Sequence, residues 1–171
     1  MRQQNIELYE LTPSDIKNNS PEYQYFLKLK INLVKIHQKF ANDFGLHDLV
    51  VERYNIDNAK IKANNGRKGV VIKGDGGKDI GILEYQIDIG RGLADLNTDT
   101  EWKKRLVIKK IMFNWRYRNS GNFRTVIQLL STMYPNTPIE AECWYNLPAH
   151  GAYKKLGFKP IITTYMLAPN K

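Results

Sequence analysis

The chain has 171 residues, 42% of them hydrophobic, which fits one domain with a buried core and argues against wholesale disorder. No run approaches about 18 apolar residues, so no membrane span is expected, and the N-terminus lacks the pattern of a secretory signal. The single cysteine, Cys143, excludes an intrachain disulfide framework and a cysteine-rich zinc site. We therefore expect one domain over residues 1–171, in the cytoplasm and away from membranes.

The chain is strongly basic, with a net charge of +9. Such a balance favours an anionic partner: a nucleic acid, an acidic membrane or a phosphorylated small molecule. The segment 101–124 holds eight basic residues and one acidic residue, a local balance of +7. A charge run is usually a solvated face, but this one also contains an apolar strand pattern and a glycine turn.

The first 45 residues predict a strand and two helices. Residues 6–11 alternate in polarity as a strand does. Thr12 followed by Pro13 and Asp15 is typical of a capped helix start, and Ser20-Pro21 predicts a longer helix that ends at Gly45. Its apolar positions step by three and four and predict one buried stripe. They are Phe26, Leu29, Leu33, Ile36, Phe40 and Phe44.

Residues 46–66 stay open between a helix over 46–54 and a strand over 59–63. After them, 69–73 and 80–89 are strand-like and flank the glycine-rich turn 74–77, which predicts a hairpin. Residues 106–113 form the next strand. Two adjacent lysines, Lys109 and Lys110, interrupt its alternation, and a β-bulge would accommodate them.

The last third alternates helices and strands. Helical patterns cover 121–133 and 148–156, and strand patterns cover 139–145 and 158–167. An early meander followed by such crossovers implies a mixed sheet covered by helices.

The turn that leads from strand 106–113 into helix 121–133 is the first chemical motif. A strand that passes through a glycine turn into a helix presents unpaired backbone N–H groups, and the helix dipole adds positive potential. With Arg116, Arg118 and Arg124 nearby, the place suits a phosphate or pyrophosphate. An ordinary turn with surface arginines explains this motif alone equally well.

The second motif spans residues 146–158. It resembles the closing motif of the GNAT acetyltransferase superfamily: Asn, two residues, Ala, three residues, Tyr, three residues, Gly-Phe. Asn146, Ala149, Tyr153 and Gly157-Phe158 meet each position. Upstream, Arg118, Gly121 and Phe123 occupy the places of that family's acyl-CoA signature, and the spacing between the motifs suits one helix and one strand. The resemblance is good over residues 80–167 and loose over 6–15.

The resemblance implies a mixed, mostly antiparallel α/β sheet with a splayed parallel pair of strands and flanking helices. It implies acetyl-CoA as co-substrate, its pantetheine arm paired with strand backbone and its pyrophosphate held by the turn. The implied cofactor-binding residues are Ile111, Met112, Phe113, Arg118, Asn119, Ser120, Gly121, Asn122, Phe123, Arg124, Asn146 and Tyr153. Phe123 departs from the family's Gly or Ala, so either its side chain points away from the phosphate or the helix lies farther from it.

The resemblance also implies direct attack of an amine on the thioester, with Tyr153 as general acid. A neutral tyrosine, with a reference pKa of about 10, keeps its proton at pH 7 and can donate it to a thiolate. The competing interpretation of Tyr153 is an aromatic ring that packs on the sheet. The general base is less clear, because strand 106–113 holds no acid.

Four carboxylates are the alternatives for that base by strand position: Glu84, Asp88, Glu140 and Glu142. Glu84, expected on one face with Ile80 and Ile82, is our candidate beside Tyr153. For each of the four, an exposed or ion-paired carboxylate is the competing interpretation.

Acetyl-CoA and an amine acceptor are thus the expected partners. A rival from another class is a module of this fold that binds CoA or another anion without turnover. A nucleic-acid-directed protein ranks third, because most excess charge falls on the cofactor side. The acceptor and the oligomeric state stay open, a homodimer among the alternatives.

Overall fold

The computed structural model describes residues 5–43, 66–90, 103–141 and 148–158 of the chain. Its strands are β1 (Glu7–Glu10), β2 (Arg67–Lys73), β3 (Asp79–Gly90), β4 (Lys103–Phe113) and β5 (Ile139–Ala141). Its α-helices are α1 (Pro13–Lys17), α2 (Pro21–Asp43), α4 (Asn122–Met133) and α5 (Pro148–Lys155). The predictions for residues 46–54, 59–63 and 159–167, and for the later part of strand 139–145, lie outside the described residues.

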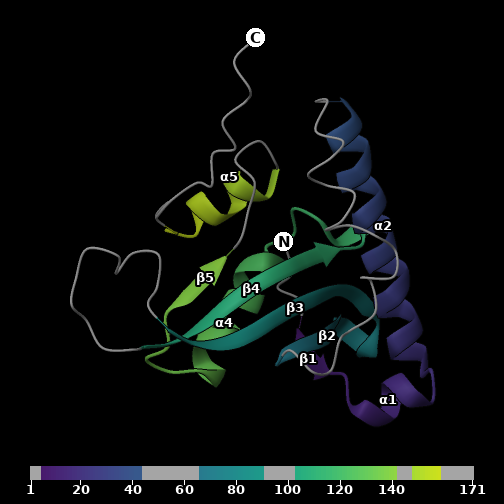
Figure 1. The fold of residues 1–171 in the computed structure, drawn as a ribbon, viewed down its shortest axis with the longest axis horizontal. Coiled ribbons are helices and arrows are strands. Elements are labelled where there is room, and N and C mark those ends of the chain that lie inside the picture. Colours follow the sequence, from purple (N-terminus) through teal and green to yellow (C-terminus); the bar gives the residue numbers. More distant parts are fainter. Residues whose placement is uncertain (1–4, 44–65, 91–102, 142–147, 159–171) are drawn as a thin grey trace.

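The strands form one mixed sheet in the order β1-β2-β3-β4-β5 (Figure 1). The first four are antiparallel neighbours, and β2 and β3 form the predicted hairpin around a 3₁₀ turn at Asp75–Gly77. β4 and β5 are parallel, with Leu106 opposite Ile139 and Ile108 opposite Ala141. The prediction of a mostly antiparallel sheet with a parallel pair is confirmed. Any splay beyond Ala141 falls outside the described residues.

Two bulges set which side chains share a face. Tyr85 lies opposite Ile108 and Glu84 opposite Lys110, which leaves Lys109 as the extra residue of the predicted bulge in β4. A second bulge, at Ile80, was not predicted. It turns Ile80 away from Ile82, so the expectation that Ile80, Ile82 and Glu84 share one face is wrong for Ile80.

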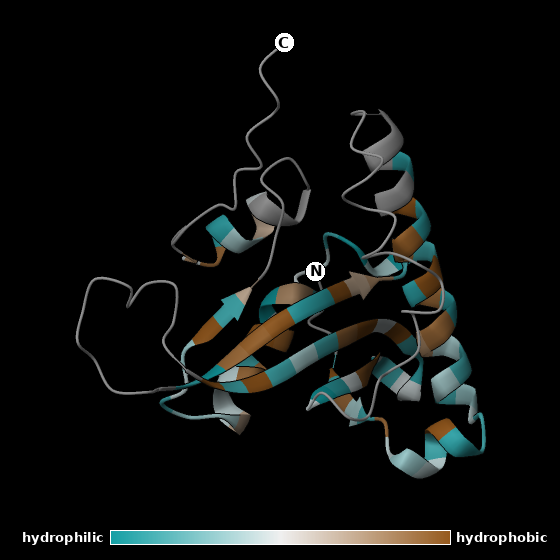
Figure 2. Ribbon diagram, in the orientation of Figure 1, coloured by the Kyte–Doolittle hydropathy of each residue, from teal (hydrophilic) through white to brown (hydrophobic). Residues whose placement is uncertain are grey.

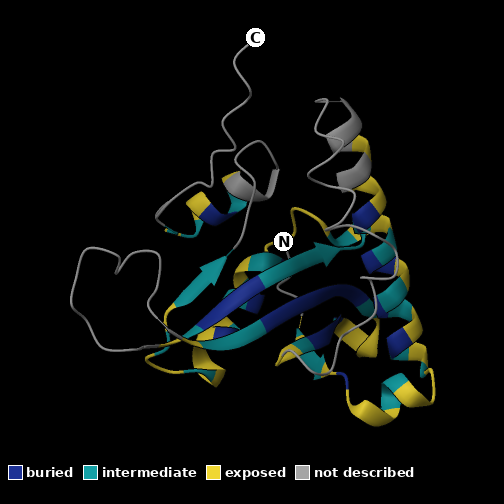
Figure 3. Cartoon of the chain, viewed as in Figure 1, coloured by how far each residue is buried: buried dark blue, intermediate teal, exposed yellow. Residues whose placement is uncertain are grey.

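Each face of the sheet has its own core. On one face Leu83 and Tyr85 of β3 pack with Val126 and Leu130 of α4. On the other, Ile82 packs with residues of α2 and the turn before α1. Because both faces are covered, the middles of the strands carry continuous hydrophobic runs, such as residues 70–72 and 106–108. The buried residues follow the middle of β3 and β4 and one side of α2 (Figures 2 and 3). We call the side that α2 covers the α2 face.

The buried side of α2 differs from the predicted stripe. Phe26 and Leu29 are buried as expected, but Ile36 is 47% exposed. Lys30 and Val34 are buried instead, so the deepest positions step by four from Phe26. The prediction placed only apolar residues in the stripe and therefore passed over Lys30. The side chains of the last two predicted positions, Phe40 and Phe44, lie outside the described residues.

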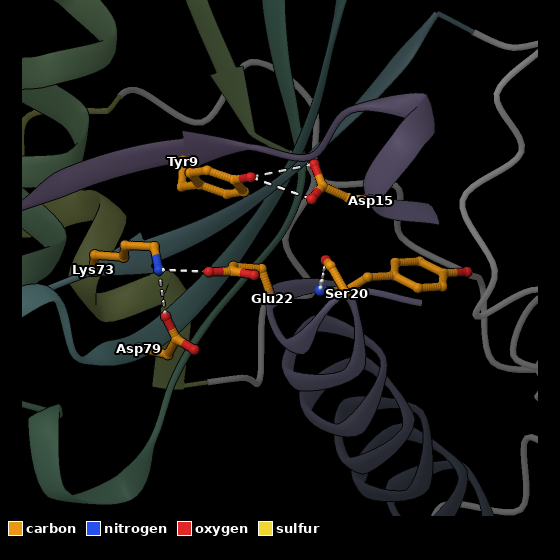
Figure 4. A network of polar contacts seen from close by, with 7 residues as sticks. Tyr9, Asp15, Ser20, Glu22, Lys73 and Asp79 are labelled. Atoms are coloured by element: carbon orange, nitrogen blue, oxygen red, sulfur yellow. Dashed lines mark hydrogen bonds and ion pairs between the residues drawn. The ribbon is translucent and has the colours of Figure 1, made fainter. Parts of the chain in front are cut away.

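A polar network joins the first elements of the chain (Figure 4). Thr12 and Asp15 form the predicted capping box of α1, and the Tyr9 hydroxyl donates to Asp15 at 3.2 Å. Lys73 lies between Glu22 of α2, at 3.1 Å, and Asp79 of β3, at 3.3 Å. The network thus holds α1 and the start of α2 against the edge of the sheet.

Candidate active site

The turn between β4 and α4 has the geometry of an open helix start. Gly121 immediately precedes α4 with φ +83°, in the left-handed region, and no side chain caps the helix. A Cβ at this position would meet nothing within 4 Å, so the backbone angle and not crowding favours glycine there. The first N–H groups of a helix have no partner within it. This end of α4 can therefore receive an anion.

Three polar side chains of the turn donate to backbone carbonyl groups. Ser120 Oγ and Asn122 Nδ2 both donate to the carbonyl oxygen of Tyr117, at 2.7 and 3.1 Å. Arg118 Nε donates to the carbonyl oxygen of Phe113, the last residue of β4, at 3.2 Å. The first two bonds stabilise the turn itself, and the Arg118 bond fixes it to the end of β4. Asn119, Ser120, Gly121 and Arg124 are exposed, whereas Asn122 is buried.

The end of β4 is held tightly against β3. Gly81 lies opposite Phe113, and a Cβ on it would be 2.7 Å from the Met112 carbonyl oxygen. Such a contact is too short, so only glycine permits this spacing. Ile111 and Phe113 pack against the α4-side core and Met112 against the α2-side core. Within the described residues, β5 accompanies β4 only as far as Ile108.

Helix α5 ends in a cap that explains several residues of its motif. Gly157 has φ +85°, its N–H donates to the Lys154 carbonyl at 3.0 Å, and the N–H of Phe158 donates to the Tyr153 carbonyl at 3.2 Å. This is the Schellman pattern, in which the residue after glycine folds back onto the last turn. The Phe158 ring accordingly lies 5.1 Å from the Tyr153 ring, centroid to centroid.

Tyr153 also connects the two motifs. Its buried ring meets the ring of Phe123, on α4, edge to face at a centroid distance of 4.9 Å. The first turn of α4 and the predicted acid on α5 are therefore neighbours. Phe123, the departure from the family pattern, uses its bulk to pack on Tyr153.

Glu84, the candidate base, lies buried in an ion-pair cluster on the α2 face. Its Oε2 is 2.6 Å from the Lys30 ammonium and its Oε1 is 3.3 Å from Arg67 Nη1. Lys110 lies opposite Glu84 across the β3–β4 ladder. Burial lowers the pKa of Lys110, the charges of Lys30 and Arg67 lower it further, and Glu84 acts in the opposite direction.

Of the other candidate bases, two form ion pairs and one lies outside the described residues. Asp88 and Glu140 both face Arg105, at 3.9 and 3.5 Å. Glu142 and Asn146 lie outside the described residues. Among the described residues no group of acidic, histidine or cysteine side chains could hold a metal ion.

Comparison of the coordinates with solved structures gives full-length matches. One is the tetramutant of the Bacillus halodurans protein BH1408, with a TM-score of 0.67, 16% identity, and 95% of this chain and 99% of that chain covered. The aminoglycoside 6'-N-acetyltransferase of Acinetobacter baumannii matches with a TM-score of 0.52, 14% identity and 98% of each chain covered. The ribosomal-protein-alanine N-acetyltransferase of Brucella melitensis matches with a TM-score of 0.53, 10% identity, and 96% and 99% covered.

The fold is that of the GNAT acetyltransferases. The sequence alone matches no protein-family model and no curated protein. The fold assignment therefore comes from the arrangement of elements in space, and it agrees with the GNAT resemblance of the two short motifs.

Within this GNAT-like fold the structure groups the predicted site residues in two places. The turn residues 118–124, the end of β4 and Tyr153 lie together through the Arg118–Phe113 bond and the Phe123–Tyr153 contact. Glu84, on β3, belongs to a second group, with Lys30, Arg67 and Lys110 on the α2 face, whereas Tyr153 is on α5.

Sequence reasoning missed Lys30 and Arg67. Lys30 follows Phe26 by four residues and precedes Val34 by four, so it is a lysine inside the buried stripe of α2. A buried lysine needs a counter-charge, and that requirement was the available signal. Arg67 carried no comparable signal. No helix among the described residues has the length and hydrophobicity that a membrane crossing requires.

Proposed function

We propose that this chain is an N-acetyltransferase that binds acetyl-CoA and moves its acetyl group to a primary amine. One observation carries the proposal: the open, glycine-led start of α4 and the ring of Tyr153 are joined through Phe123. This contact supports the proposal because it brings the turn that we propose for the pyrophosphate close to the phenol that we propose as proton donor. The acyltransferases among the structural matches support the same chemistry.

In the proposed reaction the backbone of residues 111–113 pairs with the pantetheine arm, as an added strand would. The N–H groups of residues 119–124, with Arg118, Arg124 and Asn146, hold the phosphates and the cofactor. The neutral amine attacks the thioester carbonyl, the carbon–sulfur bond breaks, and Tyr153 gives its proton to the departing thiolate. Glu84, the sequence-based candidate for acceptor of the amine's proton, is held in ion pairs with Lys30 and Arg67, so we propose that this proton leaves through water. The single cysteine suits a reducing cytosol.

Calorimetry with acetyl-CoA tests the cofactor. We expect binding that weakens as salt rises, because the phosphate contacts are charge-assisted. Gly121→Asp and Gly121→Asn form a matched pair, since both residues tolerate the left-handed region but only Asp adds a negative charge. Binding should be lost in Gly121→Asp and largely kept in Gly121→Asn. A folded wild type that gives no heat at any salt concentration removes the cofactor from the proposal.

A CoA-binding module without turnover is the second candidate, and the structure supplies an observation in its favour. Tyr153 packs between Phe123 and Phe158, so its ring is useful to the fold whether or not its hydroxyl reacts. The two candidates differ in what the hydroxyl does.

Tyr153→Phe separates them, because the ring and its packing stay. If the hydroxyl protonates the thiolate, turnover should fall by about 10²-fold or more while the Kd for acetyl-CoA changes little. Tyr134→Phe is the control: it removes a hydroxyl that bonds to the Tyr85 hydroxyl at 2.9 Å, on the side of the sheet that α4 covers, and should leave turnover unchanged. Equal turnover in wild type and Tyr153→Phe removes Tyr153 as the acid. A wild type that binds acetyl-CoA but acetylates no amine in a broad panel favours the module.

A further inference from the structure

The ion pairs of the Glu84 cluster form a chain that runs from the core to the surface. Lys30 is 1% exposed and Glu84 is 2% exposed, and their ammonium and carboxylate are 2.6 Å apart. The other oxygen of Glu84 is 3.3 Å from Nη1 of Arg67, whose side chain is 41% exposed. A buried lysine thus fixes a buried carboxylate, and that carboxylate holds one edge of a guanidinium at the surface.

Arg67 keeps most of its donors for another group. A guanidinium has five N–H donors in a rigid planar fork, which suits a carboxylate or phosphate bound through two parallel bonds. Among the described residues, the ion pair to Glu84 uses Nη1 alone. The side chain is 41% exposed, and the ion pair to Glu84 restricts its orientation.

The surroundings of Arg67 are positive. Lys30 and Arg67 share the Glu84 carboxylate, and Lys110 lies opposite Glu84 on β4. Two positive charges against one negative charge leave the two cations in mutual repulsion. A second anion would relieve that repulsion, and the part-exposed Arg67 is where it can enter.

The cluster lies beside the strand segment that we propose for the pantetheine arm. Lys110 directly precedes residues 111–113 on β4, and it shares the α2 face with Met112. Arg67 is on β2 and contacts the side chain of Glu84 on β3, and β3 lies one strand spacing, roughly 5 Å, from β4. A small molecule can span that distance with an amine at one end and an acid at the other.

We propose that Arg67 binds the acidic group, a carboxylate or a phosphate, of the amine acceptor, with Glu84 and Lys30 as positioning residues. The inference rests on the proposed acetyl transfer and names its substrate class: small amines that also carry an acid. Lys110 adds positive potential beside the bound acid. The general base is then supplied from elsewhere or through water, because Glu84 is engaged with Arg67.

Matched pairs of acceptors test the substrate class. 4-Aminobutanoate is compared with 4-aminobutanamide, and O-phosphoethanolamine with ethanolamine, each with acetyl-CoA at fixed ionic strength. We expect kcat/KM for the acidic member to exceed that of the neutral member by about 10-fold or more, because a charge-assisted bidentate contact is added. The pair with the larger ratio shows whether the carboxylate or the phosphate is preferred. Equal values within both pairs overturn the proposal.

Arg67→Gln locates the effect. In this variant the ratio of kcat/KM for the acidic acceptor to kcat/KM for the neutral acceptor should fall toward one, mainly because KM for the acidic acceptor rises. Lys68→Gln is the control, because Lys68 is the next residue, carries the same charge and pairs with Glu10 at 3.0 Å; its ratio should equal that of the wild type. A ratio that falls equally in both variants indicates general charge, not a site, and overturns the assignment to Arg67.

The double substitution Lys30→Met with Glu84→Leu tests the positioning roles. It replaces the buried pair with apolar side chains, which proteins often tolerate, and it leaves Arg67 without its anchor. We expect the ratio to fall several-fold while the Kd for acetyl-CoA stays the same. A merely structural pair would leave the ratio unchanged, and that result would remove Lys30 and Glu84 from the proposal.

Binding without cofactor keeps this proposal separate from the acetyl-transfer proposal. Ligand-observed NMR follows 4-aminobutanoate and O-phosphoethanolamine with the wild type and with Arg67→Gln. Binding of either probe to the wild type that is lost in Arg67→Gln supports the anion site even if acetyl-CoA gives no heat. If neither probe distinguishes the two proteins, the anion site is wrong even where acetyl-CoA binds.

Discussion

Two charged clusters on the α2 side of the sheet are built in opposite ways. In the Lys73 cluster one cation lies between two carboxylates, those of Glu22 and Asp79, at 3.1 and 3.3 Å. In the Glu84 cluster one carboxylate lies among cations, with Lys30 at 2.6 Å and Arg67 at 3.3 Å. Both clusters tie α2 to the strands. Only the second carries an excess of positive charge.

The pKa values of the two lysines reflect this difference. Burial by itself would lower the pKa of Lys73, but its hydrogen bonds and ion pairs with Glu22 and Asp79 outweigh burial and raise it. For Lys110 burial lowers the pKa, Glu84 acts in the opposite direction, and the charges of Lys30 and Arg67 also lower it, so the pKa stays below its ordinary value.

The Lys73 cluster has one carboxylate in excess, and both of its carboxylates are 26% exposed, so water can solvate the extra charge. The Glu84 cluster has one cation in excess, and its outer cation, Arg67, is 41% exposed. An exposed excess cation can bind an anion, and we therefore place recognition there.

The largest stability effect is expected from Glu84→Gln. The substitution leaves Lys30 as a buried ammonium without its counter-charge, and breaking a buried pair in this way costs about 3–5 kcal/mol. Urea unfolding followed by circular dichroism measures the loss. The Lys30→Met, Glu84→Leu double variant should recover most of it, because the buried ion pair is then replaced by apolar side chains. A loss below about 1 kcal/mol in Glu84→Gln would show that the pair is as weak as one on the surface.

The order and type of the elements could be predicted because they depend on local signals. Thr12 and Asp15 are three residues apart and form the capping box that they predicted. The two adjacent lysines of β4 broke the strand alternation, and the structure has its bulge at Lys109. These signals act over a few residues, so the sequence displays them directly.

Contacts between distant elements could not be predicted in the same way. The partner of Glu84 is Lys30, 54 positions earlier in the chain, and their pairing depends on how α2 crosses the sheet. The bulge at Ile80 changed the face of one residue, and no alternation pattern indicated it. The contact between Phe123 and Tyr153 explains a departure from the family motif, but only the packing of α4 and α5 reveals it.

Lys73→Met should cost less than Glu84→Gln. It removes the cation between Glu22 and Asp79 and the contact of Lys73 with the Tyr9 ring, whose centroid is 5.2 Å away. Lys73 is 16% exposed and the two carboxylates are 26% exposed, so water can partly solvate them. We expect a loss of about 1–3 kcal/mol, between the values for surface and buried pairs.

Lys68→Met is the matched control for Lys73→Met, because it breaks a more exposed ion pair and should lose less stability. Lys68 and Glu10 are 39% and 45% exposed, and removing such a pair typically costs about 0–1 kcal/mol. The three substitutions therefore rank by burial, with Glu84→Gln first and Lys68→Met last. If Lys73→Met costs as little as Lys68→Met, the Lys73 cluster does not clamp α2 to the sheet, and the contrast between the two clusters fails.

The smallest expected effect is a change in the stability of Asp15→Asn, relative to the wild type, as the pH is lowered. Hydrogen bonds from the side chain and backbone of Thr12 lower the pKa of Asp15 below its usual value of 3.8. A carboxyl group with a lowered pKa in the fold contributes stability above its unfolded pKa, and that contribution is lost as pH falls through the folded pKa. Asp15→Asn should therefore be less stable than the wild type at neutral pH, by an amount that shrinks below about pH 4. Urea midpoints between pH 7 and pH 3 measure this difference. Lys17→Gln, on the same helix, should show no such narrowing, because it removes no acid. A difference between Asp15→Asn and wild type that stays constant or widens toward acid would show that the capping box does not depend on the ionised carboxylate.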